Sequence, residues 1–222
     1  MIFAIAAAFV LGVQQQDSPL LTRVQIVIDA GDWADVKASP FLPQGYGSGY
    51  LSGPAEVRLC DRLTCVVLVP EDSAAGLRAG DVTFGVKPVT GSSLAERLQQ
   101  APVSRARVEI ADAPPQPDFS IANDSLPVVY FLETARFAVP RETLANLEGW
   151  FRSAGARVIR EGEGMVVQFE SQSLRITPAY GQVGVESLSF QLRREFAGNP
   201  TFRFGQRGRL RFGPGRIASW TF

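Results

Sequence analysis

The sequence contains no histidine. Histidine is the usual acid–base group near neutral pH and a common metal ligand, so its absence excludes Ser-His-Asp catalysis, Cys-His catalysis and histidine-ligated zinc. Cysteine is scarce as well, with Cys60 and Cys65 alone, and a zinc site needs more ligands than these two. We therefore predict no bound metal and no cofactor, and find no strong catalytic signature.

An excess of charge of either sign is also missing. Lys and Arg number 22, Asp and Glu number 22, and the formal net charge is zero. The whole molecule therefore has no general attraction to nucleic acid or to a membrane surface. Phe and Arg alternate near the C-terminus, a pattern that can also bind single-stranded nucleic acid. The neutral net charge argues against such a partner.

Long hydrophobic runs are limited to residues 1–13. This run is too short for a stable membrane span, which needs about 20 apolar residues, but it suits the apolar part of a secretory signal. We predict a signal peptide over residues 1–12, cleaved after Gly12, and a periplasmic or secreted protein. No cysteine follows the run, so a lipid anchor is not supported; a buried N-terminal helix is the alternative.

The pattern of the second half predicts the unit that organises the chain. Residues 128–132 read as a buried strand, Pro140 fits the start of a helix, and Gly155 fits its left-handed end. The helix has an apolar stripe at helical spacing, formed by Leu144, Leu147, Trp150, Phe151 and Ala154. Strands are expected at 157–160, 165–169 and 185–192, with residues 174–176 as an extension of the middle strand. The unit is β-α-β-β-β.

The first half reads as a looser copy of this unit. Residues 24–29 predict a strand, and residues 33–38 a short helix that Asp32 caps and Pro40 ends. The glycine-rich residues 45–49 are interpreted as a surface loop. Further elements are expected at 56–60 and 64–69 as a hairpin, at 81–87 as a strand, and at 93–100 as a helix that a capping box opens.

These patterns predict an α+β fold of two units. The first unit covers residues 20–110, residues 111–124 form a proline-rich linker, and the second unit covers residues 125–222. The tail alternates Phe with Arg at 201–204 and 210–212 and continues to 222, which predicts half-buried antiparallel strands with Arg outward. We expect these strands to form an additional C-terminal β-hairpin.

Cys60 and Cys65 flank the loop of the predicted hairpin at 56–69. The two residues can lie opposite each other on the two strands, and an exported protein favours a disulfide between them. Two free buried thiols are the alternative.

Two β-α-β-β-β units in one chain resemble the vicinal oxygen chelate fold, the architecture of glyoxalases and extradiol dioxygenases. More narrowly, residues 24–29, 39–42 and 218–222 resemble an uncharacterised family of exported bacterial proteins of this glyoxalase-like type. The resemblance implies a cupped mixed or antiparallel sheet, which in such folds holds a divalent metal through His, Glu or Gln. Here Arg23, Val66 and Val67 stand where ligands are expected, so the resemblance implies the cup without its usual metal chemistry. An oxygen-only site of Asp and Glu stays open.

Strand alternation selects the residues that would face such a cup. We expect the apolar face of residues 24–29 to meet the helices and the other face to line the cup. The candidate ligand-binding residues are Arg23, Gln25, Asp29, Glu133, Ser187, Ser189 and Gln191. They predict a small polar or anionic ligand with Arg23 as the charge partner. The alternative is a solvated sheet face.

Three functions are compatible with the sequence. The missing histidines favour a metal-free binding or structural member of the glyoxalase-like fold. An enzyme is the second, with Glu133 or Asp29 as base and Arg23 stabilising an anion, as a lyase, isomerase or hydrolase. A protein-interaction module that uses the aromatic tail is the third.

Overall fold

The computed structural model describes residues 18–61, 63–71, 77–99, 104–112, 128–196, 198, 200–204 and 207–222. The predicted signal peptide at 1–12 lies outside these residues, and so does the predicted linker except for residues 111 and 112. Within the described part of the chain, no helix has the length and apolar character needed to cross a membrane.

The first half forms a six-stranded mixed sheet, sheet A. Its strands lie in the order β2-β3-β4-β1-β5-β6. The bounds are β1 Leu20–Ile28, β2 Tyr50–Ser52, β3 Val57–Cys60, β4 Cys65–Pro70, β5 Val82–Lys87 and β6 Ala106–Ile110. The helices are α1 Ala30–Ala38, α2 Phe41–Tyr46 and α3 Leu94–Gln99, with the 3-10 turn η1 at Gly47–Gly49.

The second half forms an eight-stranded mixed sheet, sheet B. Its strands lie in the order β12-β13-β14-β11-β7-β10-β9-β8. The bounds are β7 Val129–Val139, β8 Arg157–Glu161, β9 Gly164–Gln168, β10 Ser173–Pro178, β11 Gly184–Leu192, β12 Thr201–Phe204, β13 Gly208–Gly213 and β14 Ile217–Thr221. One helix, α4 at Arg141–Ser153, follows β7, and Gly155 takes the expected left-handed conformation just after it.

The two halves repeat one topology. In each half a strand and a helix precede three further strands, and the first strand pairs in parallel with the last of these three, as β1 does with β4 and β7 with β10. A fifth strand then pairs antiparallel with the other edge of the first strand, as β5 does with β1 and β11 with β7.

The sequence patterns missed three strands. Two belong to the first half: β2, which is only three residues long and follows the glycine-rich residues, and β6, for which no element was expected. The third, in the second half, is β10: residues 174–176 do not extend the middle strand but belong to a strand of their own, antiparallel to β9. The turn between β9 and β10, where the Phe169 N–H donates to the Gln172 carbonyl, contains neither Gly nor Pro, so the usual turn signal is missing.

Two other expectations about the sheets are wrong. The units form two sheets and not one cupped sheet, because the apolar faces of the two sheets pack against each other. The C-terminal addition is three antiparallel strands, β12, β13 and β14, and not a hairpin, with β14 joined to β11.

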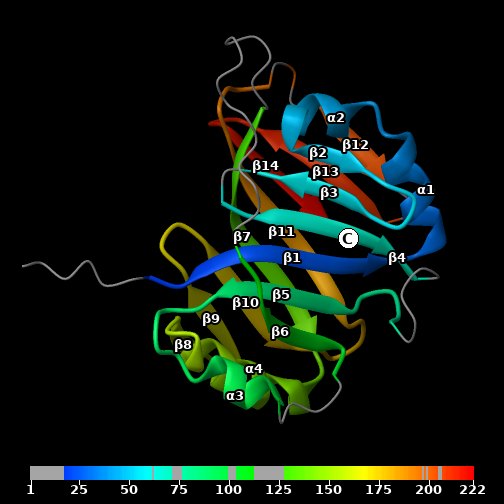
Figure 1. Ribbon diagram of the computed structural model, residues 1–222. Coiled ribbons are helices and arrows are strands. Elements are labelled where there is room, and N and C mark those ends of the chain that lie inside the picture. The colour runs from blue at the N-terminus through cyan, green and yellow to red at the C-terminus, as the bar shows by residue number, and fades with distance from the viewer. Residues whose placement is uncertain are drawn as a thin grey trace, which may run out of the picture.

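One apolar core lies between the two sheets (Figure 1). Val24, Ile26 and Ile28 point into it from sheet A, where they were expected to meet helices, and Phe84 of β5 meets Phe137 of β7 with ring centroids 4.9 Å apart and perpendicular planes. Helices close the two ends of the strand order: α3 and α4 lie beside β6 and β8, and α1 and α2 lie beside β2, β3, β4 and β12. Both halves therefore contribute to this main core, and a separate small cluster of Cys60, Cys65, Val67 and Val69 is buried on the other face of sheet A.

The glycine-rich residues 45–49 form structure where a loop was expected. They belong to the end of α2 and to η1, and Gly45, Tyr46 and Gly49 are buried. A Cβ at Gly45 would lie 2.8 Å from the ring of Phe41. That ring packs on the C-terminal strands, 4.6 Å from Phe202 and 4.9 Å from Phe212. The glycine is needed for this packing of α2 against sheet B.

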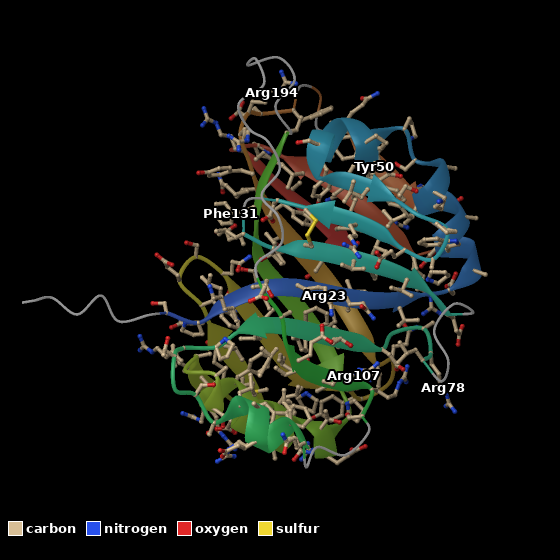
Figure 2. The ribbon with its side chains drawn as sticks, in the orientation of Figure 1. Arg23, Tyr50, Arg78, Arg107, Phe131 and Arg194 are labelled. Carbon is tan, nitrogen blue, oxygen red and sulfur yellow. A yellow bond between two sulfur atoms is a disulfide. The ribbon has the colours of Figure 1, made fainter. Side chains whose placement is uncertain are left out.

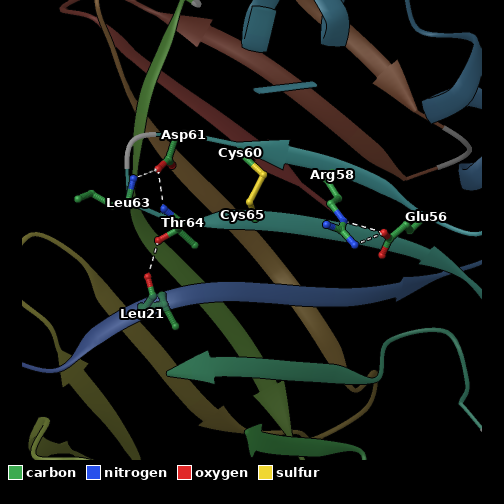
Figure 3. The surroundings of a disulfide bond; sticks show 8 residues. All are labelled: Leu21, Glu56, Arg58, Cys60, Asp61, Leu63, Thr64 and Cys65. Carbon is green, nitrogen blue, oxygen red and sulfur yellow. Dashed lines mark hydrogen bonds and ion pairs between the residues drawn. A yellow bond between two sulfur atoms is a disulfide. The ribbon is translucent and has the colours of Figure 1, made fainter. Parts of the chain in front are cut away.

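A disulfide joins Cys60 and Cys65 across the hairpin of β3 and β4 (Figure 3). The two residues are direct cross-strand partners with Cα atoms 4.0 Å apart, next to the hydrogen bond from the Asp61 N–H to the Thr64 carbonyl. Such closely spaced pairs without their own backbone hydrogen bonds bring side chains nearest to each other. The expected disulfide is therefore present in the structure.

The turn of this hairpin connects the two sheets. Asp61, only 3% exposed, accepts hydrogen bonds from the backbone N–H groups of Leu63 at 2.7 Å, Thr64 at 2.8 Å and Leu132 in β7 at 2.6 Å. The Thr64 hydroxyl donates to the Leu21 carbonyl at 2.7 Å and accepts from the Gln172 side chain. Burial raises the pKa of Asp61 to about 6, although the three N–H bonds act in the opposite direction.

The disulfide should make a measurable contribution to the free energy of unfolding. Closing a loop this short stabilises a fold by about 2 kcal/mol through the unfolded chain, and the cysteines are five residues apart. We expect Cys60→Ala/Cys65→Ala to lower the free energy of unfolding by that amount in denaturant titration. The same loss should follow reduction of the wild-type protein; an unchanged midpoint after complete reduction would contradict this account.

Asp61 predicts a dependence of stability on pH. Its folded pKa of about 6 lies above its ordinary value of 3.8, so its contribution is fully present below pH 3.8 and is lost as the pH rises through 6. The difference between these two pKa values corresponds to a loss of about 3 kcal/mol in the free energy of unfolding. We expect Asp61→Asn, measured by urea titration from pH 4 to pH 7, to lack this decline relative to wild type. Asp112→Asn, at an exposed carboxylate, is the control and should follow the wild-type curve; parallel curves for wild type and Asp61→Asn would refute the assignment.

Candidate functional site

A cleft of about 1020 Å³ lies where the ends of the two units meet. Its walls are the C-terminal ends of β1 and β10, the start of β11, the start of α1, and the connection at residues 179–183. Phe222 also lines it, so it lies on the side of Figure 1 where the C-terminus is marked and β1 ends. Ala138 of β7 and Gly80, just before β5, also line it, so the equivalent ends of β1 and β7 and the equivalent starts of β5 and β11 meet around this one opening.

Two glycines let the halves come together beside the cleft. Gly80 precedes β5 and Gly184 begins β11, and both have positive φ, 89° and 137°. A Cβ on Gly80 would overlap the carbonyl oxygen of Val183, and a Cβ on Gly184 would lie 2.8 Å from the Cα of Gly80. Gly80 is also held to β1, where its N–H donates to the Val27 carbonyl at 2.8 Å. Backbone therefore packs on backbone at the edge of the cleft.

Carboxylates dominate the charged lining of the cleft. Asp29 caps α1, with its Oδ1 accepting from the Asp32 N–H at 2.8 Å. The helix consequently begins at Ala30, earlier than expected, and its cap is Asp29 in place of Asp32. Glu186 and Arg207 line the same space. Burial raises the pKa of Asp32, the nearby Asp29 and Asp35 raise it further, and Arg207 opposes them.

Of the residues proposed from sequence, Asp29 lines the cleft. Arg23 and Gln25 lie on the outer face of sheet A, away from sheet B, and Figure 2 shows Arg23 in the middle of that face. Asp29 is six residues further along the chain than Arg23, a separation of about 20 Å in extended chain. Arg23 and Asp29 therefore do not form one site.

The charge of Arg23 already has a partner. Its guanidinium pairs with Glu109 of β6, passing over Gly85, where a Cβ would lie 2.8 Å from the Arg23 Cβ. Burial lowers the pKa of Arg23, Arg58 lowers it further, and Glu56 opposes them. An anionic ligand at Arg23 would have to displace Glu109.

The remaining candidates lie on the opposite side of the molecule. Ser187, Ser189 and Gln191 belong to the outer face of sheet B, because Leu188, Phe190 and Leu192 between them are buried in the core. Glu133 is exposed at an irregularity in the pairing of β7 with β11. The predicted set is thus divided between the two outer faces and the cleft, and a ligand role for each residue stays a prediction.

The sequence reasoning missed most of the cleft. Its polar lining includes Asp32, Tyr180, Gln182, Glu186 and Arg207. The connection at 179–183 carries exposed Tyr180, Gly181 and Gln182, a pattern ordinary for a surface turn. Asp29 and Asp32, three apart after a buried strand, were the available signal, but Asp29 was assigned to the same site as Arg23 and Asp32 was interpreted as a helix cap alone. Within the described residues no group of three or more Cys, Asp or Glu side chains is arranged to hold a metal ion.

Comparison with known proteins adds a distant structural similarity. No model of a protein family matches the chain, and no curated protein sequence is significantly similar to it. Among solved structures, the chain is similar to a xylose isomerase-like TIM barrel/4-hydroxyphenylpyruvate dioxygenase fusion protein, with 10% sequence identity and a TM-score of 0.45. The alignment covers 84% of this chain and 40% of that protein. At this level of similarity no residue role transfers.

The contact between Gly80 and Val183 predicts an unusually costly substitution. Gly91 also has positive φ, 77°, but a Cβ there meets nothing within 4 Å. Gly91→Ala should therefore cost only the strain of a left-handed alanine, about 1 kcal/mol. Gly80→Ala adds the overlap with backbone and should cost about 3 kcal/mol. Both free energies come from urea unfolding; equal losses in the two variants would show that the halves do not meet as closely as described.

Proposed function

We propose that this protein binds a small organic cation, such as an amine-bearing metabolite, in the cleft between its two units. The observation that carries the proposal is the lining: Asp29, Asp32 and Glu186 face the space, with Arg207 as the opposing charge. The opening has the size of a small-molecule site, since such pockets range from about 300 to 1,000 Å³.

The electrostatics of Asp32 support a positively charged ligand. Its raised pKa has burial as the main cause and the like charges of Asp29 and Asp35 as the next. A bound ammonium group would relieve this repulsion and would lower the pKa again, because an opposite charge nearby favours the ionised carboxylate. The ligand charge is therefore opposite to the one expected from Arg23.

We further propose that the fold is a variant of the glyoxalase-like fold and that the protein is exported. The β-α-β-β-β pattern found in both halves supports the first part, together with the sequence resemblance. The apolar run at the N-terminus supports the second, as does the disulfide between Cys60 and Cys65, since such bonds persist in oxidising compartments.

A thermal-shift titration tests the cleft. The probes are spermidine as the cation, glucose as a neutral molecule and citrate as the anion, at matched ionic strength. At one hundred times Kd a ligand stabilises by about 2.7 kcal/mol, a rise in Tm of roughly 5–10 °C for a chain of this length. We expect spermidine alone to raise Tm, and Asp32→Asn to reduce the spermidine-induced shift at least threefold.

Asp35→Asn is the matched control. It removes one negative charge from the same helix and one of the repulsions on Asp32, but Asp35 does not line the cleft, so the spermidine shift should fall far less than in Asp32→Asn. Equal shifts in wild type and Asp32→Asn, or a larger shift with citrate than with spermidine, would overturn the proposal.

A further inference from the structure

The outer face of sheet B carries two continuous rows of side chains that run across all eight strands. In one row, direct strand pairing links Ser219, Ser189, Thr134 and Ser173 on four adjacent strands. The hydroxyls of Thr134 and Ser173 are 3.0 Å apart. All four residues are partly exposed, so the middle of this face is a band of hydroxyl groups.

Arginines flank the hydroxyls in both rows. In the second row, direct pairing links Arg203, Arg209, Thr221, Ser187, Arg136 and Arg175. In the first row, Arg211 lies beyond Ser219, and Arg157 lies beyond Ser173 and Gln168. Arg203, Arg209 and Arg211 lie on β12 and β13, and Arg136, Arg175 and Arg157 lie on β7, β10 and β8. All six are exposed. In the pairing, Arg203 is opposite Arg209, and Arg136 is opposite Arg175, so like charges are adjacent within each group. Adjacent like charges are unfavourable unless an anion lies between them.

Few carboxylates balance these charges. Glu161 pairs with Arg175 at 3.2 Å, and Glu133 is exposed on β7. Among the described residues no ion pair involves Arg136, Arg157, Arg203, Arg209 or Arg211. The outer face of sheet A differs, since Arg23 pairs with Glu109 and Arg58 with Glu56. In a chain of zero net charge, positive charge is thus concentrated on one face.

The dimensions of the face fit an extended chain. Eight strands at about 4.8 Å span roughly 34 Å between the outermost strands, and three strand spacings, about 14 Å, separate β13 from β7. A ligand that lies across the strands along the row of Arg209 and Arg136 would therefore meet guanidinium groups, then hydroxyls, then guanidinium groups again.

We propose that this face binds an acidic polysaccharide. Guanidinium groups bind carboxylates and sulfates in a bidentate manner, and serine and threonine hydroxyls can exchange hydrogen bonds with sugar hydroxyls. The two rows contain no aromatic side chain, whereas single-stranded nucleic acid is held largely by stacking on aromatic rings. Charge and hydroxyl pattern together favour a glycan chain with regularly spaced acidic groups.

Binding of immobilised polygalacturonate tests the proposal. We expect Arg209→Gln/Arg211→Gln and Arg136→Gln/Arg175→Gln each to weaken binding at least tenfold and to flatten its dependence on salt concentration. Ser189→Ala/Thr134→Ala should weaken binding several-fold with an unchanged salt dependence, because it removes hydrogen bonds and no charge. Arg23→Gln/Arg107→Gln is the control, which removes two charges from the outer face of sheet A and should bind like wild type.

The remaining outcomes decide against the proposal. Absence of polygalacturonate binding, or equal losses in the control and in the sheet B variants, would overturn it. Tighter binding of a single-stranded oligonucleotide or of anionic lipid vesicles than of polygalacturonate would assign the face to another partner. Circular dichroism confirms that each variant is folded, and the spermidine shift of the cleft should persist in all of them, so the two proposals succeed or fail separately.

Discussion

The arrangement of the two sheets depends on the buried carboxylate of Asp61. It accepts three backbone N–H groups, two within its own turn and one from Leu132 in the other sheet. Thr64, in the same turn, reaches β1 and the turn between β9 and β10. The disulfide holds the strands that lead into this turn. Hydrophobic packing is not directional, whereas these hydrogen bonds fix the position of sheet A relative to sheet B.

Local patterns predicted many of the elements but not their partners. The stripe of Leu147, Trp150 and Phe151 and the stop at Gly155 predicted α4, and the alternation of Phe with Arg correctly placed Arg203 and Arg211 outward. Alternation, however, says which residues share a face and not what that face meets. The apolar face of Val24 and Ile26 was therefore expected to pack against helices. It packs instead against a second sheet, whose strands begin about a hundred residues later.

The candidate site was harder to predict, because it is made by segments that are distant in sequence. Asp29 was identified at the end of a strand, but Glu186 and Arg207 reach the same cleft from the other half. Arg23 was assigned to an anion because its partner, Glu109, is 86 residues away. The arginines of sheet B, from Arg136 on β7 to Arg211 on β13, form a cationic face only when the strands that carry them are assembled in one sheet. Contacts between residues so far apart in the sequence produce no local sequence pattern from which they could be predicted.

The single core shared by both sheets also affects how the protein is made. During synthesis the first half emerges with the inner face of sheet A uncovered, because the strands that cover it, from β7 to β14, are translated last. A nascent sheet with an exposed apolar face is prone to aggregate. Stable folding of sheet A therefore has to await the strands of sheet B, and Trp220 of β14, which is buried in the core, is contributed by the last of these strands.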